Sequence, residues 1–222
     1  MSQTKIQIPE VTLFGVDAHD PEGLLLAAQK SQEHVHFGAV EIITRRLFYG
    51  REGYSNFCIK DMHAYIHTSH ALMIHPDGYI LNPSAWDPAW LSYDYIGALW
   101  EFFTDNKKNG NGGFTLRSKK LLNAISDLAA KGIIQKFHPE DHIICRVHRE
   151  LLEKEYGIVF APDEVCRKFS IESYGNPHPV YTGQFGFHGY GLDFQMLPPE
   201  QRPYEVKHIK LYPAVWKWGA SS

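Results

Sequence analysis

The sequence predicts a single α/β domain with a mostly parallel, Rossmann-like central sheet flanked by helices. Apolar, β-branched segments alternate along the chain with segments whose apolar residues recur at helical spacing. Such alternation favours parallel strands covered by helices on both faces. The 222 residues are 44% hydrophobic and 14% aromatic, which is enough for one substantial core. We therefore expect one domain over residues 1–222, with neither a linker nor an internal repeat.

The order of the elements follows from the hydrophobic pattern. The expected strands are apolar runs at residues 11–17, 37–44 and 71–75, with shorter candidates at 79–81 and 114–116. The expected helices are amphipathic or proline-initiated and span residues 21–34, 54–66, 117–130 and 139–155. From Ser170 the pattern dissolves into Gly, Pro, Tyr and His. Residues 190–222 are expected to form a tail that packs on or near the active site.

Charge and cysteine content restrict the class of protein. The formal net charge is −3, so the molecule as a whole should not attract nucleic acid or an anionic membrane, and such a partner would need a local patch. The three cysteines are far apart and lack CxxC spacing, which argues against a disulfide framework or a thiolate zinc site. No run approaches the roughly 20 apolar residues of a spanning helix. We expect a cytoplasmic protein in a reducing compartment.

Two acidic residues follow predicted strands, where open α/β sheets bind their ligands. Asp77 ends the third strand in the sequence HPDG, where its carboxylate could bind a divalent cation that bridges a diphosphate. An ordinary Asp-Gly turn would explain the same residues. Asp17 could accept a hydrogen bond from a base or ribose, or cap the helix that begins near Pro21.

A glycine-rich segment precedes the strand-like residues 114–116. Asn111, Gly112, Gly113 and Phe114 would allow backbone amides to approach a substrate closely. The segment is not a phosphate-binding P-loop, because no GK[ST] follows. A glycine loop with no ligand remains the alternative.

Three further residues are candidates for chemistry. Glu140 and Asp141, at a helix start, could supply a general base that takes a proton from an acceptor hydroxyl. Favourable pairing with the helix dipole would explain one of them. Of the two we assign Asp141 as the base, with Glu140 as a capping or acceptor-orienting residue. His188 could return from the late irregular segment to ligate a metal, although most of the 13 histidines should be structural.

Six ordered motifs resemble a glycosyltransferase-like family often catalogued only as a domain of unknown function. They are YSNF at 54–57, DGYILNPSAW at 77–86, YDYIGA at 93–98, NGGFTLRS at 111–118, PED at 139–141 and FGFHG at 185–189. The resemblance runs from about residue 11 to 189. It implies the GT-A type of fold, a UDP-sugar donor carrying a hexose or N-acetylhexosamine, and Mn²⁺ or Mg²⁺.

The resemblance also implies roles for residues. In that fold a strand-end acidic motif, often DxD, holds the metal and the donor diphosphate. Here the corresponding place reads His75-Pro76-Asp77, so only the last acid is present. His188 is similar to the late histidine that completes the metal site in several such enzymes. The loop with Gly112 and Gly113, followed by the Glu-Asp pair, resembles inverting transferases in which the loop contacts the donor sugar and the acid is the base.

Two acceptors compete. The family resemblance often leads to saccharide assembly, as in capsule or lipopolysaccharide. A resemblance to phage TET-associated DNA glycosyltransferases implies instead 5-hydroxymethylcytosine in double-stranded DNA, which we favour. Basic segments that could meet DNA phosphates are residues 45–46, 107–108, 117–120 and the tail. A non-catalytic nucleotide-sugar-binding module and a hydrolase of the donor are the alternatives of other classes.

Overall fold

The computed structural model describes residues 5–172 and 180–189. The strands in the described ranges are β1 (Ile6–Val16), β2 (Val35–Ile43), β3 (His70–Ile74), β4 (Tyr95–Ile96), β5 (Thr115–Ser118), β6 (Ser170–Glu172) and β7 (Gly186–His188). The first five form one sheet in the order β2-β1-β3-β5-β4. β1 is parallel to β2 and β3, while β5 is antiparallel to β3 and β4. Four strands therefore share one direction, which confirms the mostly parallel sheet.

The helices in these ranges are α1 (Pro21–Gln32), α2 (Gly50–Lys60), α3 (Lys119–Ala130), α4 (Glu140–His142), α5 (Arg149–Tyr156) and α6 (Asp163–Phe169). Short 3₁₀ turns span Met62–Tyr65, Pro83–Ala85 and Pro88–Ser92, and a π-helical turn spans Ile143–Val147. The α1 helix begins where Asp20 accepts a hydrogen bond from the Gly23 amide at 2.9 Å. None of these helices is both long and apolar enough to cross a membrane.

The structure departs from the predicted elements at several boundaries. Ser118 caps α3 by accepting a hydrogen bond from the Leu121 amide, so the predicted helix start at residue 117 is wrong and Arg117 belongs to β5. The single helix predicted over 139–155 is divided by the π-helical turn. Residues 79–81 form no strand and contribute only an isolated bridge at Ile80.

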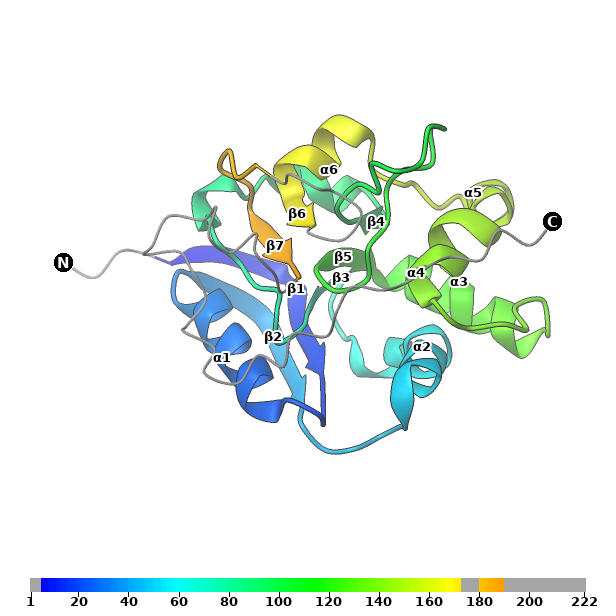
Figure 1. Ribbon diagram of the computed structural model, residues 1–222, viewed down its shortest axis with the longest axis horizontal. Coiled ribbons are helices and arrows are strands. Elements are labelled where there is room, and N and C mark those ends of the chain that lie inside the picture. The colour runs from blue at the N-terminus through cyan, green and yellow to red at the C-terminus, as the bar shows by residue number, and fades with distance from the viewer. Residues whose placement is uncertain (1–4, 173–179, 190–222) are drawn as a thin grey trace.

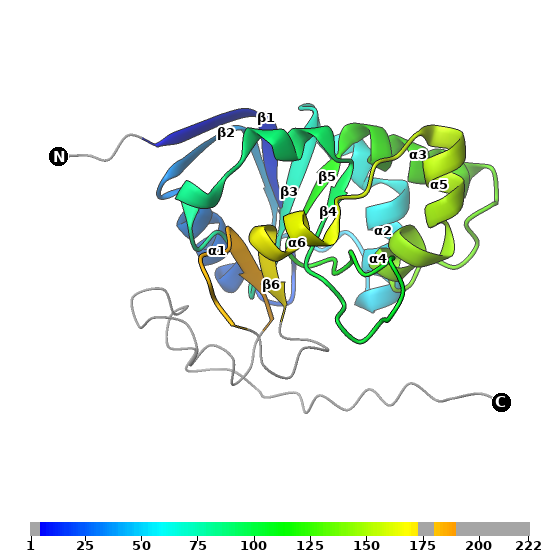
Figure 2. The same ribbon diagram turned by 90° about the horizontal axis from the view of Figure 1, so that it is seen from above.

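Helices cover both faces of the sheet. Along β3 the side chains alternate: Ala71 and Met73 join the core beneath α2 and α3, whereas Leu72 and Ile74 join the core beneath α1 and α6. Figures 1 and 2 show α1 on one side of the sheet and α2, α3 and α5 on the other. This is the layered arrangement that the alternating pattern predicts.

A small second sheet brings the end of the described chain back to β3. β6 and β7 pair in parallel, and the Leu81 amide donates to the Phe185 carbonyl oxygen at 2.8 Å. The Gly189 amide donates to the Asp77 carbonyl oxygen at 3.0 Å. His188, at the end of β7, is thereby placed beside the turn that follows β3. The sequence pattern did not predict either of these three-residue strands.

Candidate active site

The carboxyl ends of β1 and β3 lie at the same edge of the sheet. Gly15 of β1 pairs with Ile74 of β3, so Asp17 and His75, which follow these strands, share that edge. Asp17 accepts hydrogen bonds from the amides of His19 and Asp20 at 2.6 and 2.8 Å. Asp17 therefore stabilises the turn before α1. The N-cap of α1 is Asp20, so the alternative that Asp17 caps this helix is wrong.

The turn after β3 is a tight Asp-Gly turn that also carries the candidate ligands His75 and Asp77. The Gly78 amide donates to the His75 carbonyl oxygen at 3.0 Å and closes it. A Cβ atom on Gly78 would lie 2.9 Å from the Phe187 carbonyl oxygen and 3.3 Å from that of Gly113. Glycine is therefore required here by close packing of the turn against β7 and the glycine-rich loop. The turn fixes Asp77 beside both.

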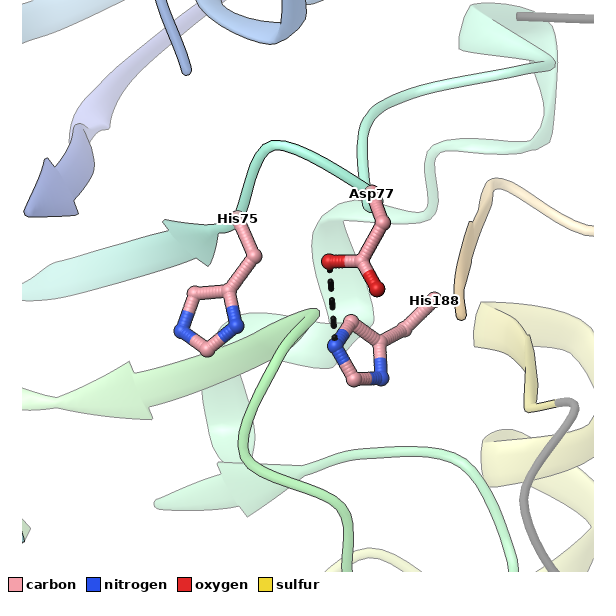
Figure 3. A group of neighbouring side chains, drawn as sticks. All are labelled: His75, Asp77 and His188. Atoms are coloured by element: carbon pink, nitrogen blue, oxygen red, sulfur yellow. Dashed lines mark ion pairs between the residues drawn. The ribbon is translucent and has the colours of Figure 1, made fainter. Parts of the chain in front are cut away.

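His75, Asp77 and His188 form a cluster at this turn. His188 Nε2 lies 3.4 Å from Asp77 Oδ1, and one ligand atom of each of the three residues lies within 4.8 Å of the others. Figure 3 shows the His188 ring next to the Asp77 carboxylate and the His75 ring to one side of the pair, with one His75 ring nitrogen directed toward them. The structure thus brings together the two predicted metal ligands and adds His75.

A neighbouring side chain holds the outer nitrogen of each imidazole. Tyr54 Oη lies 2.7 Å from His75 Nε2, and Glu172 Oε2 lies 2.8 Å from His188 Nδ1. The nitrogen of His75 that faces the cluster is therefore Nδ1, and that of His188 is Nε2. Histidines that ligate metals are commonly oriented in this way through their second nitrogen.

The protonation of the cluster follows from its burial and charges. Burial, together with the charge of His188, lowers the pKa of His75 to about 4, so its imidazole is neutral. Burial alone would raise the pKa of Asp77, but the facing His188 lowers it to about 2. Burial opposes the charge of His188, yet Asp77 and Glu172 together raise its pKa well above the ordinary value.

These donors fit a divalent cation. The set consists of a neutral imidazole, a carboxylate and an imidazole whose proton a cation can displace, which suits Mn²⁺ and its neighbours among transition metals. Ligand atoms about 2.0–2.2 Å from one ion are at most about 4.4 Å apart. The observed spread of up to 4.8 Å needs only a small inward movement of the side chains.

The glycine-rich loop separates the cluster from the Glu140-Asp141 pair. A Cβ atom on Gly113 would lie 1.9 Å from His188 Nε2, and one on Gly112 would lie 2.4 Å from Glu140 Oε1. Asn111 adopts a φ of 61° and accepts a hydrogen bond from the Gly113 amide at 2.9 Å. Gly113 therefore packs closely against His188 on one side of the loop, and Gly112 packs closely against Glu140 on the other.

Phe114 does not enter the site through its side chain. Its ring is fully buried and packs against Phe169 and Phe185, with centroid separations of 5.3 and 6.0 Å. The prediction for Phe114 concerned the backbone of the loop, and it stays a prediction. Phe114 instead anchors the end of the glycine-rich loop in the core.

Glu140 and Asp141 occupy different environments. Glu140 is buried, with its Oε1 3.2 Å from Nη2 of the fully buried Arg117 and its Oε2 3.3 Å from the donating Ser55 hydroxyl. Asp141 is only partly buried, and its Oδ1 accepts a hydrogen bond from the His142 amide at 2.7 Å. Burial and the nearby charge of Glu140 raise the pKa of Asp141 to about 7. Asp141 is therefore the carboxylate better suited to exchange a proton near neutral pH.

Charges on one side of the glycine-rich loop affect the pKa of groups on the other side. Glu172, which bonds His188, also contributes to the raised pKa of Asp141, and Glu140 acts on the pKa of His75. The cluster and Glu140 thus lie on the two sides of the glycine-rich loop at the carboxyl edge of the sheet. Such edges are where α/β folds bind their ligands.

A family described as "Protein of unknown function (DUF5672)" matches residues 38–188. The chain belongs to the DUF5672 family. The matched segment contains His75, Asp77, Asp141 and His188, and it ends at the last of these. Among curated proteins no match was found.

The fold of this DUF5672 chain is similar to that of a crystal structure described as a glycosyltransferase involved in the glycosylation of the major capsid of PBCV-1. The TM-score is 0.51 and the sequence identity is 11%, with 84% of this chain and 93% of the other covered. At this identity the likeness establishes a shared fold. The expected α/β fold with a mostly parallel central sheet flanked by helices is thereby confirmed.

The sequence did not point to four residues of the candidate site: His75, Tyr54, Arg117 and Glu172. His75 occupies the place of the first acid of DxD, and that position was a usable signal for a ligand. Tyr54 lies in the first motif, but its bond to His75 joins α2 to the turn after β3. Glu172 lies on β6, in a segment that the pattern left irregular. The predicted tail over residues 190–222 lies outside the described residues.

Proposed function

We propose that this DUF5672 protein is a metal-dependent, inverting glycosyltransferase that moves a hexose or N-acetylhexosamine from a UDP-sugar to a hydroxyl acceptor. The observation that carries the proposal is that the His75, Asp77 and His188 cluster and Glu140, the residue before Asp141, lie against the two sides of one glycine-rich loop. Their position at the carboxyl edge of the sheet and the shared fold support it.

The donor would lie along the glycine-rich loop. His75, Asp77 and His188 would hold the divalent cation, which when bound supplies positive charge opposite the leaving diphosphate. Gly112 and Gly113 lack side chains that would fill the space next to the cluster, so the donor sugar can approach the loop backbone. Asp17, at the end of β1, would contact the ribose or base.

Asp141 would act as the general base. Its carboxylate takes the proton of the acceptor hydroxyl while the acceptor oxygen attacks the anomeric carbon of the donor. The bond from that carbon to the diphosphate oxygen breaks, and UDP leaves with the electron pair. Glu140 would keep Asp141 and the loop in position through its buried contacts with Arg117 and Ser55. A 5-hydroxymethylcytosine acceptor stays a prediction from the sequence.

A donor and acceptor panel tests the proposal. The purified protein is incubated with UDP-sugars and Mn²⁺, and UDP release and mass gain are scored on hydroxymethylated DNA, unmodified DNA and oligosaccharides. We expect transfer to one acceptor class, and D141N should lower turnover by roughly 10²–10⁴-fold while the UDP-sugar still binds. D61N, which changes an exposed aspartate after α2, is the matched control. Donor breakdown without transfer would indicate a hydrolase, and absence of UDP-sugar binding would refute the proposal.

A further inference from the structure

The candidate metal ligands are two imidazole nitrogens and one carboxylate oxygen. His75 offers Nδ1, His188 offers Nε2 and Asp77 offers a carboxylate oxygen, with the ligand atoms within 4.8 Å of one another. In the part of the chain that the structure describes, no other group of three or more His, Cys, Asp or Glu side chains converges in this way. The kind of ion that the cluster takes therefore follows from these three donors.

Three other carboxylates at this edge of the sheet have partners of their own. Glu172 Oε2 lies 2.8 Å from Nδ1 of His188, the nitrogen that does not face the cluster. Glu140 is paired with Arg117, and Asp17 accepts hydrogen bonds from two backbone amides. The cluster thus offers an ion one carboxylate and two imidazoles, whereas hard cations need a set of oxygen ligands.

His75 is held with its Nδ1 facing the cluster. The Gly78 amide donates to the His75 carbonyl oxygen at 3.0 Å, and Tyr54 Oη lies 2.7 Å from His75 Nε2. The rings of Tyr54 and His188 meet the His75 imidazole edge to face, each with a centroid separation of 5.4 Å. The imidazole can therefore turn away from an ion only by breaking these contacts.

Position 75 is where the donor atom can be changed with the least movement. Nδ1 of a histidine is bonded directly to Cγ, as a carboxylate oxygen of an aspartate is, so the two atoms lie at similar distances from the backbone. The facing nitrogen of His188 is Nε2, which lies one bond further out, beyond the reach of an aspartate. The histidine at position 75 therefore makes nitrogen, rather than oxygen, the majority donor.

Hard cations and transition metals differ in the donors that they prefer. Mg²⁺ demands near-ideal octahedral coordination by oxygen, and Ca²⁺ takes about six to eight oxygen ligands. Imidazole suits transition metals such as Fe²⁺ and Zn²⁺, and affinity for first-row divalent ions rises from Mn²⁺ through Fe²⁺ to Co²⁺. Two imidazoles and one carboxylate should therefore discriminate between these two classes of ion.

We propose that His75 makes the cluster selective for divalent transition-metal ions, so that Mg²⁺ and Ca²⁺ do not serve as its ion. The expected order of affinity is Co²⁺ above Mn²⁺, with Mg²⁺ and Ca²⁺ far below both. Three protein donors leave coordination positions open for diphosphate oxygens. The assignment rests on the proposed glycosyltransferase function for its catalytic consequence, but ion binding is measured without donor or turnover.

Competition at one fixed pH, without UDP-sugar, measures the selectivity. Co²⁺ binding to the metal-free protein is followed by its visible absorption, and Zn²⁺, Mn²⁺, Mg²⁺ and Ca²⁺ are then added as competitors. For the wild type we expect displacement by Zn²⁺ and at least about tenfold weaker competition by Mn²⁺. Mg²⁺ and Ca²⁺ should leave Co²⁺ in place even in about hundredfold excess.

H75D and H75N separate the donor atom from its charge. H75D should lower Co²⁺ affinity at least about tenfold and allow Mg²⁺ to compete, because oxygen becomes the majority donor. H75N supplies a neutral oxygen and should lower Co²⁺ affinity without gaining Mg²⁺. H36D, which changes an exposed histidine on β2, is the matched control and should behave as the wild type. Thermal unfolding checks that each variant folds, and the wild-type order tests the proposal without any variant.

The outcomes separate the two proposals. The expected ion order in a protein that does not bind UDP-sugars would support the metal assignment and refute the transferase. Transfer by the wild type that Mg²⁺ supports as well as Mn²⁺ would overturn the selectivity and leave the transferase in place. Displacement of Co²⁺ from the wild type by Mg²⁺, or unchanged Co²⁺ affinity in folded H75D, would also overturn the selectivity.

Discussion

At the scale of single residues, each histidine of the cluster has one nitrogen held by a neighbour and the other directed toward Asp77. His188 is the more strongly polarised of the two, because Glu172 and Asp77 bond its two nitrogens. Because the pKa of His188 is raised, its imidazole is protonated on both nitrogens at neutral pH in the metal-free protein. A cation can bind His188 only after displacing that proton.

Mn²⁺ affinity should therefore rise with pH through the neutral range. The proton is bound below the raised pKa of His188 and lost above it, so competition weakens as pH increases. Calorimetric titration in two buffers of different ionisation enthalpy should show about one proton released per ion near pH 7. E172Q should lower Mn²⁺ affinity about 10–100-fold, whereas E164Q, on exposed α6 surface, should not. Binding without proton release would contradict this account of His188.

Asp141 should impose a second pH dependence, on turnover. With a pKa of about 7, it is protonated and inactive as a base at pH 5, and its charged form increases as pH rises through neutrality. The free energy of unfolding changes with pH in the opposite direction. The stability that Asp141 contributes is fully present below about pH 4 and is lost as the pH rises through about 7. In denaturant titrations, the free energy of unfolding of D141N minus that of the wild type should therefore increase from pH 5 to pH 8. If this difference were the same at pH 5 and at pH 8, the raised pKa of Asp141 would be refuted.

At the scale of elements, the glycine-rich loop is the part that the others depend on. Its backbone separates His188 from Glu140, and the missing side chains of Gly112 and Gly113 let both approach. The presence of such a loop could be predicted from composition. Its exact neighbours could not, because they come from β7 and α4, and pairing between distant segments leaves no local signal in one sequence.

G113A should disable the cluster. The added methyl group would lie 1.9 Å from His188 Nε2, so the imidazole must move away from Asp77. We expect Mn²⁺ affinity to fall by at least about tenfold. G132A is the control: its φ of 71° strains any side chain, but nothing lies within 4 Å of the added atom. G132A should lower the free energy of unfolding without changing Mn²⁺ affinity. If G113A bound Mn²⁺ as tightly as the wild type, the close approach of Gly113 to His188 would be contradicted.

The longer strands could be predicted from the sequence, whereas the shortest strands and the break in the helix after Pro139 could not. The strands near residues 11–17, 37–44 and 71–75 were predictable because they are long or strongly apolar. β6 and β7 have three residues each and exist because they pair with each other and dock beside the turn after β3. The helix after Pro139 is interrupted by a π-helical turn, although its local pattern is continuous.

At the scale of the whole molecule, the sheet order explains why one edge collects the site. β1 and β3 are parallel neighbours, so Asp17 and His75 emerge together, and β7 adds His188 from the far end of the described chain. The α/β architecture and the positions of Asp77, Asp141 and His188 as polar candidates were available from the sequence. The proximity of Asp77 and His188, and the hydrogen bonds of Tyr54 and Glu172 to the two histidines, required the tertiary structure.

The most direct test of the central claim is a crystal structure of the protein with UDP and Mn²⁺, recorded at a wavelength where manganese scatters anomalously. We expect one anomalous peak bounded by His75, Asp77 and His188, with the diphosphate in contact with the ion and the uridine toward Asp17. Manganese bound elsewhere, or UDP bound away from this cluster, would contradict the proposed donor site and with it the proposed transferase mechanism.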